Sequence, residues 1–509
     1  MSRTSTAEQT RAYAQRFTKL LFRPFGQSGW LCSQAGFGGY RIHYALEEHR
    51  KALRKALLAG INIIDTSSNY GDGASEQLIG EVLQEIIEQG TWPREAFIIV
   101  SKAGYLQGQN YRNSQQRKGE GKTWPDLVEY SPGLEHCIHP DFLADQIDQS
   151  LKRLQLSAID VYLLHNPEYY LSWAKQLNIP VTEARQEYYR RIERAFVHLE
   201  TEVRHGRIHY YGISSNTFPA LSDDARFTCL ETVWNIAASI RPGHHFRVVQ
   251  MPFNLLEHQA VTTINQPSMQ SVLEFARQKK LAVLINRPLN AYCRRRLFRL
   301  SDISAGLPVP MGETEKQLQE LIRLENRFDR ELIDTFELEP NTKKTVSELF
   351  ATGSYLAVNW QKLGPYQQWL ESQAYYVVER INQGMQILTA YPQLNDEQKR
   401  WIDDYIETFN AALDGLTALL HREAARQTEA FKKEITGIRP EWDSIPKLSH
   451  RALHALRGTP GVTSVLVGMR HPDYVDDVLE ELIRPLTGEY AAEFWLNLKE
   501  QLKGWMMEK

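Results

Sequence analysis

Short apolar, β-branched runs alternate with helical patterns along much of this 509-residue chain. Seven of these runs are predicted to be buried strands, at residues 61–65, 97–102, 158–165, 208–214, 246–251, 281–286 and 462–468. An earlier candidate strand lies within 31–39, after a predicted hairpin around 22–30. Strands that are apolar at nearly every position are typical of a parallel sheet whose outer face is covered by helices.

The segments between these runs carry the 3.6-residue period of amphipathic helices. In the first segment, Leu46, Leu53 and Leu57 share one face, and Gly60 follows at the expected helix end. Eight βα units predict an α/β fold of the (β/α)8 TIM-barrel type, with its chemistry at the C-terminal ends of the strands. A doubly wound sheet is the competing architecture, but the glycines of 35–40 lack the GxGxxG spacing of its nucleotide-binding turn.

A long helical insertion is predicted between the seventh strand and its helix. Helices are expected near 314–328, 344–363 and 366–389, and a longer one carries an apolar stripe from Trp401 to Leu419. The predicted domains are a discontinuous barrel over 1–300 and 445–490, an inserted all-helical subdomain over 301–444, and a C-terminal helix over 491–509. Because both ends of the insertion leave the catalytic rim of the predicted barrel, the insertion could narrow the entrance to the site. A peripheral bundle and a surface for a protein partner are the alternatives.

Composition and charge exclude several classes of protein. The 59 Lys and Arg residues nearly balance the 62 Asp and Glu residues, so the net charge of −3 gives no footprint for nucleic acid or an anionic membrane. No stretch is apolar enough to span a bilayer, and the first residues lack the apolar core of a secretory signal. The four cysteines stand far apart without a CxxC pair, which predicts reduced thiols in a cytoplasmic protein.

Three neighbouring strands are predicted to bring a proton-donating group of side chains to one rim. The second strand ends at Asp65, and Tyr70 follows in a turn before a helix that Ser75 is expected to cap. The third strand ends at Lys102 and the fourth at His165. A buried lysine stabilises a nearby phenolate and lowers a tyrosine pKa that is otherwise ~10. An aspartate offsets the cost of burying that lysine, and a histidine can hydrogen-bond a substrate carbonyl.

These residues and their order resemble the aldo-keto reductase superfamily. The resemblance rests on DTSSNYGDGASEQLIG (65–80), IIVSKAG (98–104), YLLHNPE (162–168), GISSN (212–216), VVQMPFN (248–254), NRPL (286–289) and VTSVLVGMRHPDYV (462–475). It implies hydride transfer between a nicotinamide cofactor and a carbonyl or alcohol, with the cofactor across the strand ends and no Rossmann domain. It also implies that Tyr70 is the general acid and base, that Lys102 and Asp65 tune it, and that His165 orients the carbonyl.

The same resemblance assigns residues to the cofactor. Gln250 and Ser214, with Ser215 or Asn216, would hold the nicotinamide carboxamide on both edges and so fix which face meets the substrate. The other implied contacts are Arg287 for the pyrophosphate and Gly468, Arg470 and Asp477 around the start of the last barrel helix, which Pro472 opens. Arg470 would pair with the 2′-phosphate that distinguishes NADP from NAD, so NADP(H) is expected and NAD(H) stays open.

The chain departs from the family pattern at three places near the cofactor. Many relatives carry an aromatic residue where Asn286 stands, and Arg or Gln where Tyr474 stands. They carry Glu-Asn where this chain has Asp477 and Val478. The Asn286 departure removes the ring that would stack on the nicotinamide. The other two leave the implied catalytic residues untouched and bear on the expectation of NADP(H).

Other patterns point less directly to chemistry. The segment 105–140 is expected to be a substrate-side loop, and HCIH at 136–139 is interpreted as part of it, so no metal is predicted. The basic run 293–299 is either a phosphate clamp or a solvated helix face. The leading prediction is an NAD(P)H-dependent oxidoreductase acting on a small aldehyde, ketone or sugar. The alternative is a nucleotide-binding regulatory protein built on the same barrel, with the insertion contacting a partner.

Overall fold

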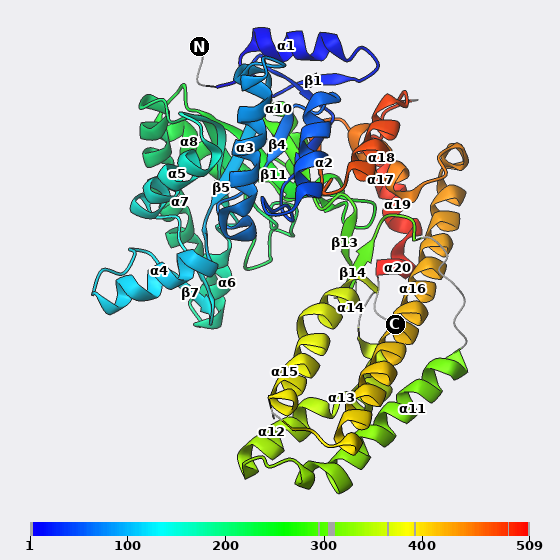
Figure 1. The fold of residues 1–509 in the computed structure, drawn as a ribbon. Helices are drawn as coiled ribbons and strands as arrows, with labels where there is room; N and C mark the ends of the chain where they lie inside the picture. Colours follow the sequence, from blue (N-terminus) through cyan, green and yellow to red (C-terminus); the bar gives the residue numbers. More distant parts are fainter. Residues whose placement is uncertain are drawn as a thin grey trace. The chain divides into compact units, whose positions relative to one another are not determined.

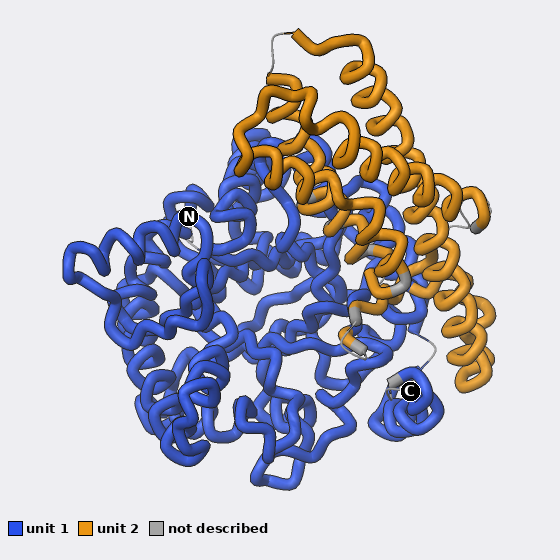
Figure 2. The backbone as a smooth tube through the Cα atoms, turned by 90° about the horizontal axis from the view of Figure 1, so that it is seen from below, with its two compact units in different colours: residues 1–291, 449–505 blue, residues 292–448, 506–509 orange. Residues whose placement is uncertain are grey.

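The computed structural model describes residues 4–293, 296–303, 311–363, 366–390, 393–486 and 488–506. The chain divides into two units, one of residues 1–291 and 449–505 and the other of residues 292–448 and 506–509 (Figure 2). We call them the barrel unit and the helical unit. Each unit has its own apolar core.

Eight parallel strands close into a barrel in the first unit (Figure 1). In order around the barrel they are β3 (Ala35–Gly38), β4 (Ile63–Asp65), β5 (Ile98–Ala103), β9 (Ile159–His165), β10 (Ile208–Ser214), β11 (Phe246–Pro252), β12 (Ala282–Asn286) and β15 (Ser464–Val467). Every residue of β5 and β9 is buried, as expected for strands with side chains in the barrel and under the outer helices. The predicted (β/α)8 barrel is confirmed.

Helices follow the strands as the periodic pattern predicts. They are α2 (Glu47–Leu58), α3 (Ala74–Glu88), α5 (Pro140–Leu154), α7 (Val181–Arg204), α8 (Leu230–Ile240), α10 (Val272–Gln278), α17 (Leu448–Arg457) and α18 (Pro472–Ile483). Two local predictions were wrong. Leu46 precedes α2 and is 51% exposed instead of sharing its buried face. Ser75 lies inside α3, where its Oγ is 2.8 Å from that of Thr66, and left-handed Gly73 stands at the N-cap.

The pairing register of the strands places polar residues side by side at one end of the barrel. Ser214 of β10 is paired with His165 of β9 on one side and with Gln250 of β11 on the other. Asp65 ends β4, and Lys102 lies one residue before the end of β5. The C-terminal ends of five strands therefore carry these five side chains on one rim.

The segment 105–140 is folded and is not the loop that its composition suggested. It forms β6 (Tyr105–Leu106), α4 (Gly108–Gly119), β7 (Val128–Ser131) and β8 (Leu134–His136), and its strands make an antiparallel sheet in the order β6-β8-β7. In Figure 1, β7 lies beside α6 (Tyr169–Gln176), and α4 packs against β6. These strands are short and alternate with polar residues, so they lack the continuous apolar pattern of the barrel strands.

The ends of the barrel unit are also structured. The predicted hairpin pairs β1 (Phe22–Pro24) with β2 (Leu31–Ser33) in antiparallel register, and α1 (Ala7–Arg16) precedes it. Near the C-terminus, α19 (Ala492–Gln501) packs in the barrel unit through Trp495, whose ring centre is 4.5 Å from that of Phe253.

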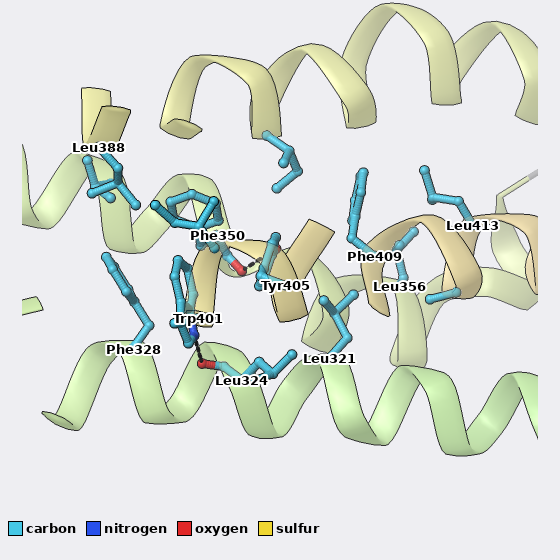
Figure 3. Close-up of a cluster of buried hydrophobic side chains, with 14 of the residues drawn as sticks. Leu321, Leu324, Phe328, Phe350, Leu356, Leu388, Trp401, Tyr405, Phe409 and Leu413 are labelled. Carbon is cyan, nitrogen blue, oxygen red and sulfur yellow. Dashed lines mark hydrogen bonds between the residues drawn. The ribbon is translucent and has the colours of Figure 1, made fainter. Parts of the chain in front are cut away.

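The helical unit is built from α11 (Met311–Arg327), α12 (Pro340–Phe350), α13 (Thr352–Asn359), α14 (Tyr366–Ser372), α15 (Val378–Thr389) and α16 (Asp396–Ile438). The apolar stripe of α16 is buried as predicted, and Trp401 stacks on Phe328 with 4.5 Å between ring centres (Figure 3). Trp401 Nε1 donates to the carbonyl oxygen of Leu324 at 3.0 Å. Glu325 accepts hydrogen bonds from the first backbone N–H groups of α13, which satisfies donors that a helix start leaves unpaired.

The basic run 293–299 does not lie on a helix. It contributes to two paired strands, β13 (Asn290–Cys293) and β14 (Arg296–Arg299), and Arg294 and Arg295 lie outside the described residues. The helix face that was one interpretation of this run is therefore wrong. Among the described residues, no helix is both long and apolar enough to cross a membrane.

Candidate active site

A buried ion pair joins Lys102 of β5 to Asp65 of β4, and hydrogen bonds connect it to residues of β11 and β10. Lys102 Nζ donates to Oδ1 of Asp65 at 2.7 Å and to the carbonyl oxygen of Thr66 at 2.6 Å. Gln250 Nε2 donates to the same Oδ1 at 2.7 Å, and Ser214 Oγ donates to Oε1 of Gln250 at 2.9 Å. Burial lowers the pKa of Lys102, and the charge of Asp65 opposes that shift. A chain of hydrogen bonds thus connects four of the predicted site residues.

Tyr70 lies beside this ion pair. Lys102 Nζ is 5.0 Å from the centre of the Tyr70 ring, and the ring centre of His165 is 5.9 Å from it. Tyr40, which is 62% exposed, packs edge-on against Tyr70 with 5.1 Å between ring centres. The fold therefore brings the four residues predicted for catalysis, including Asp65, into one group.

The pKa of Tyr70 is raised well above its ordinary value and is not lowered. Burial is the largest cause, and the negative charge of Asp65 adds to it, followed by Tyr40. The expectation that Lys102 lowers this pKa is wrong for this structure, because the ammonium is paired with Asp65 and its charge is largely offset. Tyr70 therefore keeps its proton at neutral pH and can act as a proton donor.

His165 is held as a neutral imidazole. Burial lowers its pKa well below the ordinary value, and the positive charge of Lys102 adds to the shift, followed by His136. Ser67 Oγ lies 3.0 Å from Nδ1 of His165, and His136 Nε2 donates to the His165 carbonyl oxygen at 2.8 Å. These contacts fix the ring through one nitrogen and through the backbone, so its other nitrogen can be directed at a ligand.

The two candidates for the second carboxamide contact differ in environment. Ser215 is fully buried, its Oγ accepts from the Thr217 N–H at 3.1 Å, and the two hydroxyls are also 3.1 Å apart. Asn216 is exposed, and its backbone N–H donates to Oε1 of Glu168 at 2.8 Å. Ser215 therefore packs the turn from inside, and the side chain that a ligand can reach belongs to Asn216.

One carboxylate oxygen of Glu168, Oε1, holds the backbone of this turn. The side chain is 4% exposed, and Oε2 has no hydrogen-bond partner among the residues that the structure describes. Burial raises the pKa of Glu168 to about 7, although the hydrogen bond from Asn216 lowers it. The carboxyl group therefore titrates near neutral pH.

The end of β12 offers a polar contact in place of an aromatic ring. Asn286 is the last residue of this strand, and its buried Oδ1 lacks a hydrogen-bond partner within the described part of the chain. Arg287 follows with a left-handed φ of 52°, and its guanidinium is paired with Glu257 at 2.7 Å. The predicted pyrophosphate contact is thus already engaged in an ion pair within the protein.

The end of β15 and the start of α18 carry the remaining predicted cofactor residues. Gly468 and Arg470 are exposed in the connection, and Pro472 is the first residue of the helix, as expected. Asp477, further along α18, accepts a hydrogen bond from Nε2 of His450 on α17 at 3.1 Å. Arg470 is therefore accessible near a helix N-terminus, whereas Asp477 connects two helices.

Sequence reasoning missed the residues that support the catalytic groups. Ser67 contacts His165, Glu168 supports the Asn216 turn, and His136 holds the β9 end. Asp72 accepts a hydrogen bond from the Gln109 N–H at the start of α4. Ser67 and Asp72 lie inside the motif around Tyr70, and a polar residue so close to a catalytic side chain is a usable signal. Glu168 likewise lies three residues after His165, and His136 belongs to HCIH, but their contacts with Asn216 and with the His165 carbonyl join residues distant in sequence and were not predicted.

A model of the aldo/keto reductase family matches residues 35–290, just over half of the chain. This range runs from the first residue of β3 to past the end of β12. The chain belongs to the aldo/keto reductase family.

Curated relatives match shorter stretches. L-galactose dehydrogenase of Arabidopsis thaliana is 28% identical over 158 residues, which cover 30% of this chain and 40% of that protein. 6-dehydroglucose reductase of Novosphingobium aromaticivorans is 31% identical over 156 residues, which cover 29% of this chain and 42% of that protein. A Schizosaccharomyces pombe protein, provisionally named a voltage-gated potassium channel subunit beta, is 27% identical over 197 residues, with 38% and 44% covered. The chain spans less than half of the length of each of these relatives.

Two solved structures are similar at lower identity. An aldo-keto reductase of Bacillus halodurans in its holo form is 16% identical, with 96% of this chain and 99% of that chain covered and a TM-score of 0.44. An aldo-keto reductase of Klebsiella pneumoniae in complex with NADP and acetate is 19% identical, with 52% and 67% covered and a TM-score of 0.31.

Proposed function

We propose that this protein is an NAD(P)H-dependent oxidoreductase that reduces a carbonyl group, with Tyr70 as the proton donor. The observation that carries the proposal is the group of Asp65, Tyr70, Lys102 and His165 at the ends of three neighbouring strands. A protonated phenol beside a paired lysine and a neutral imidazole suits general acid catalysis on a carbonyl oxygen. Membership of the aldo/keto reductase family supports the same reaction class.

The residues on the rim fit a dinucleotide cofactor. The unpartnered Oδ1 of Asn286 and the exposed Asn216 can hydrogen-bond a nicotinamide or its ribose, and exposed Arg470 can pair with a phosphate. We infer a preference for NADP(H) from Arg470. A reduced nicotinamide bound there would supply the hydride.

In the proposed reaction each catalytic residue has one task. Tyr70 donates its phenolic proton to the carbonyl oxygen, and His165 orients that oxygen through its free ring nitrogen. The ion pair of Lys102 and Asp65 packs beside the Tyr70 ring, with Lys102 Nζ 5.0 Å from the ring centre, and so holds the phenol at the rim. Gln250 holds the carboxylate from the opposite strand and so limits its movement.

We propose a small aldehyde, ketone or sugar as the substrate, and the sugar-derived names of two relatives support this choice. Cys32, Cys137 and Cys229 are buried free thiols, which supports a reducing compartment such as the cytoplasm.

Turnover tests the proposal directly. The purified chain is incubated with NADPH or NADH and a panel of aldehydes, ketones and sugars, and oxidation of the cofactor is followed by absorbance. We expect carbonyl-dependent oxidation of NADPH with at least one member of the panel. Tight cofactor binding without turnover on any substrate would contradict the proposal and would favour the nucleotide-binding regulatory protein, whose support is the name of the Schizosaccharomyces pombe relative.

A further inference from the structure

The turn that carries Tyr70 has an unusual backbone. Gly71, Asp72 and Gly73 all have left-handed φ angles, of 57°, 57° and 93°. Glycine tolerates this region, but aspartate enters it only at a steric cost. Asp72 therefore needs contacts elsewhere that hold it in this conformation.

Those contacts come from the first turn of α4. Both carboxylate oxygens of Asp72 accept a hydrogen bond from the backbone N–H of Gln109, at 3.0 and 2.9 Å. The Arg112 guanidinium lies 3.5 Å from the same carboxylate. Gln107 is the N-cap residue of α4, but its side chain does not cap the helix in the described structure. Asp72, from a different element, supplies the cap instead.

The helix start is shaped around this carboxylate. A Cβ added to Gly108 would lie 2.6 to 2.7 Å from the carboxylate atoms of Asp72, and Gly108 itself has a left-handed φ of 52°. Only glycine allows both the backbone conformation and the close approach at this position. A second link runs from Nδ2 of Asn69 to Oε1 of Gln107 at 3.1 Å. The residues on both sides of Tyr70 are therefore tied to the start of α4.

The folded segment that contains α4 also holds the second catalytic ring. His136 of β8 donates to the carbonyl oxygen of His165, and Tyr105 of β6 accepts from Nδ2 of Asn166 at 2.6 Å. One segment, residues 105–136, thus contacts the backbone or neighbours of both Tyr70 and His165.

We propose that Asp72 is a positioning residue that fixes the Tyr70 turn by capping α4, so that the segment 105–136 sets the geometry between Tyr70 and His165. The proposal rests on the proposed function for its catalytic readout. Misplacing a reacting group by about 1 Å can cost a hundredfold in rate. Loss of the Asp72 contact is therefore expected to act on the chemical step and not on cofactor binding.

The test compares Asp72→Gly with Asp72→Asn. Glycine accepts the left-handed backbone but cannot cap α4, so kcat should fall roughly ten- to a hundredfold while the cofactor Kd stays unchanged. Asparagine tolerates the same backbone and caps about as well as aspartate, so kcat should stay within about threefold of the wild type. Gly108→Ala adds a methyl group that displaces the Asp72 carboxylate, so this change on α4 should reproduce the effect of Asp72→Gly.

Thr6→Ala is the matched control, because Thr6 caps α1 by accepting from the Gln9 N–H at 3.1 Å and has no link to the Tyr70 turn in the described structure. It should lower stability without changing kcat.

Amide hydrogen exchange of the intact chain gives a readout that needs no turnover: Asp72→Gly should speed exchange in peptides covering 68–74 and 108–119. If the wild type shows no turnover, the proposed function fails, and the exchange result alone decides whether Asp72 holds the Tyr70 turn to α4. If Asp72→Gly leaves exchange unchanged, or leaves kcat unchanged in an active enzyme, the positioning role is wrong.

Discussion

Gln250 on β11 and Asp65 on β4 meet across the end of the barrel, with Nε2 of the amide donating to Oδ1 of the carboxylate at 2.7 Å. The same oxygen accepts from Lys102, so a single atom links the proton-donating group to the residue that family resemblance places at the nicotinamide. The carboxylate cannot turn toward one partner without weakening its contact with the other. Asp65 thus couples the two halves of the proposed site.

Removing one member of the buried ion pair should destabilise the barrel. Lys102→Met leaves Asp65 without its counter-charge in a buried site, and such losses cost about 3–5 kcal/mol. Lys55→Met is a matched control, because the pair between Lys55 and Asp476 is exposed and worth about 0–1 kcal/mol. Denaturant unfolding measures the free energy of unfolding of both variants. Equal losses of this free energy would show that the pair of Lys102 and Asp65 contributes no more than an exposed ion pair.

Tyr70→Phe should abolish carbonyl reduction while leaving cofactor affinity nearly unchanged. The phenol supplies the proton, and general acid catalysis is worth ~10²–10⁴ in rate. Tyr40→Phe serves as the control, since Tyr40 packs on the Tyr70 ring but is largely exposed. Because the pKa of Tyr70 is raised, Tyr70 stays protonated near neutral pH. The rate of reduction by the wild type should therefore show no change near neutral pH that is due to ionisation of Tyr70. Turnover by Tyr70→Phe within a few-fold of the wild type would remove the assignment.

Glu168 should make stability depend on pH. Its pKa is raised to about 7 in the folded chain from an ordinary 4.5, so the folded state binds this proton more tightly than the unfolded state. The contribution is therefore fully present below pH 4.5 and is lost as the pH rises through 7, by up to about 3 kcal/mol. Glu168→Gln keeps an oxygen for the Asn216 N–H and should remove this slope. Unfolding measured from pH 5 to 8 for both proteins isolates the difference, and parallel curves would contradict it.

The barrel strands could be predicted from the sequence almost to the residue. The run 208–214 is β10 itself, and 158–165 differs from β9 by one residue, because both are apolar and bounded by polar turns. The small sheet of 105–136 could not, since its strands are short, partly polar and paired through contacts that are distant in sequence. Residue types at strand ends sufficed to name Asp65 and Tyr70. They could not predict the raised pKa of Tyr70, which is caused first by burial of the ring in the folded chain and then by the negative charge of Asp65.

Arg470→Ala should weaken NADPH binding far more than NADH binding. Arg470 is exposed near the N-terminus of α18, where an anion is favoured, and only NADPH carries a 2′-phosphate. Loss of a charge-assisted hydrogen bond worth ~1.5–3 kcal/mol corresponds to a roughly ten- to hundredfold weaker affinity. Fluorescence titration with each cofactor gives both constants. Equal losses for NADPH and NADH, or a wild type that prefers NADH, would refute the assignment.

The barrel unit should fold without the helical unit. The strand order of the barrel is closed by β12, β15 and β3, and the helix before β15 is α17, so none of the described residues of 312–440 forms a barrel strand or helix. Among the described residues, the core around Trp401 and Phe328 consists of residues of the helical unit. Replacing 312–440 with a short Gly/Ser linker should therefore leave a cooperative thermal transition and cofactor binding close to that of the full chain.

If the insertion narrows the entrance to the site, the KM or the range of carbonyl substrates should change in this variant while the cofactor Kd does not. A folded variant with every kinetic constant unchanged would show that the insertion has no part in substrate selection, and a variant that cannot fold would show that the two cores depend on each other.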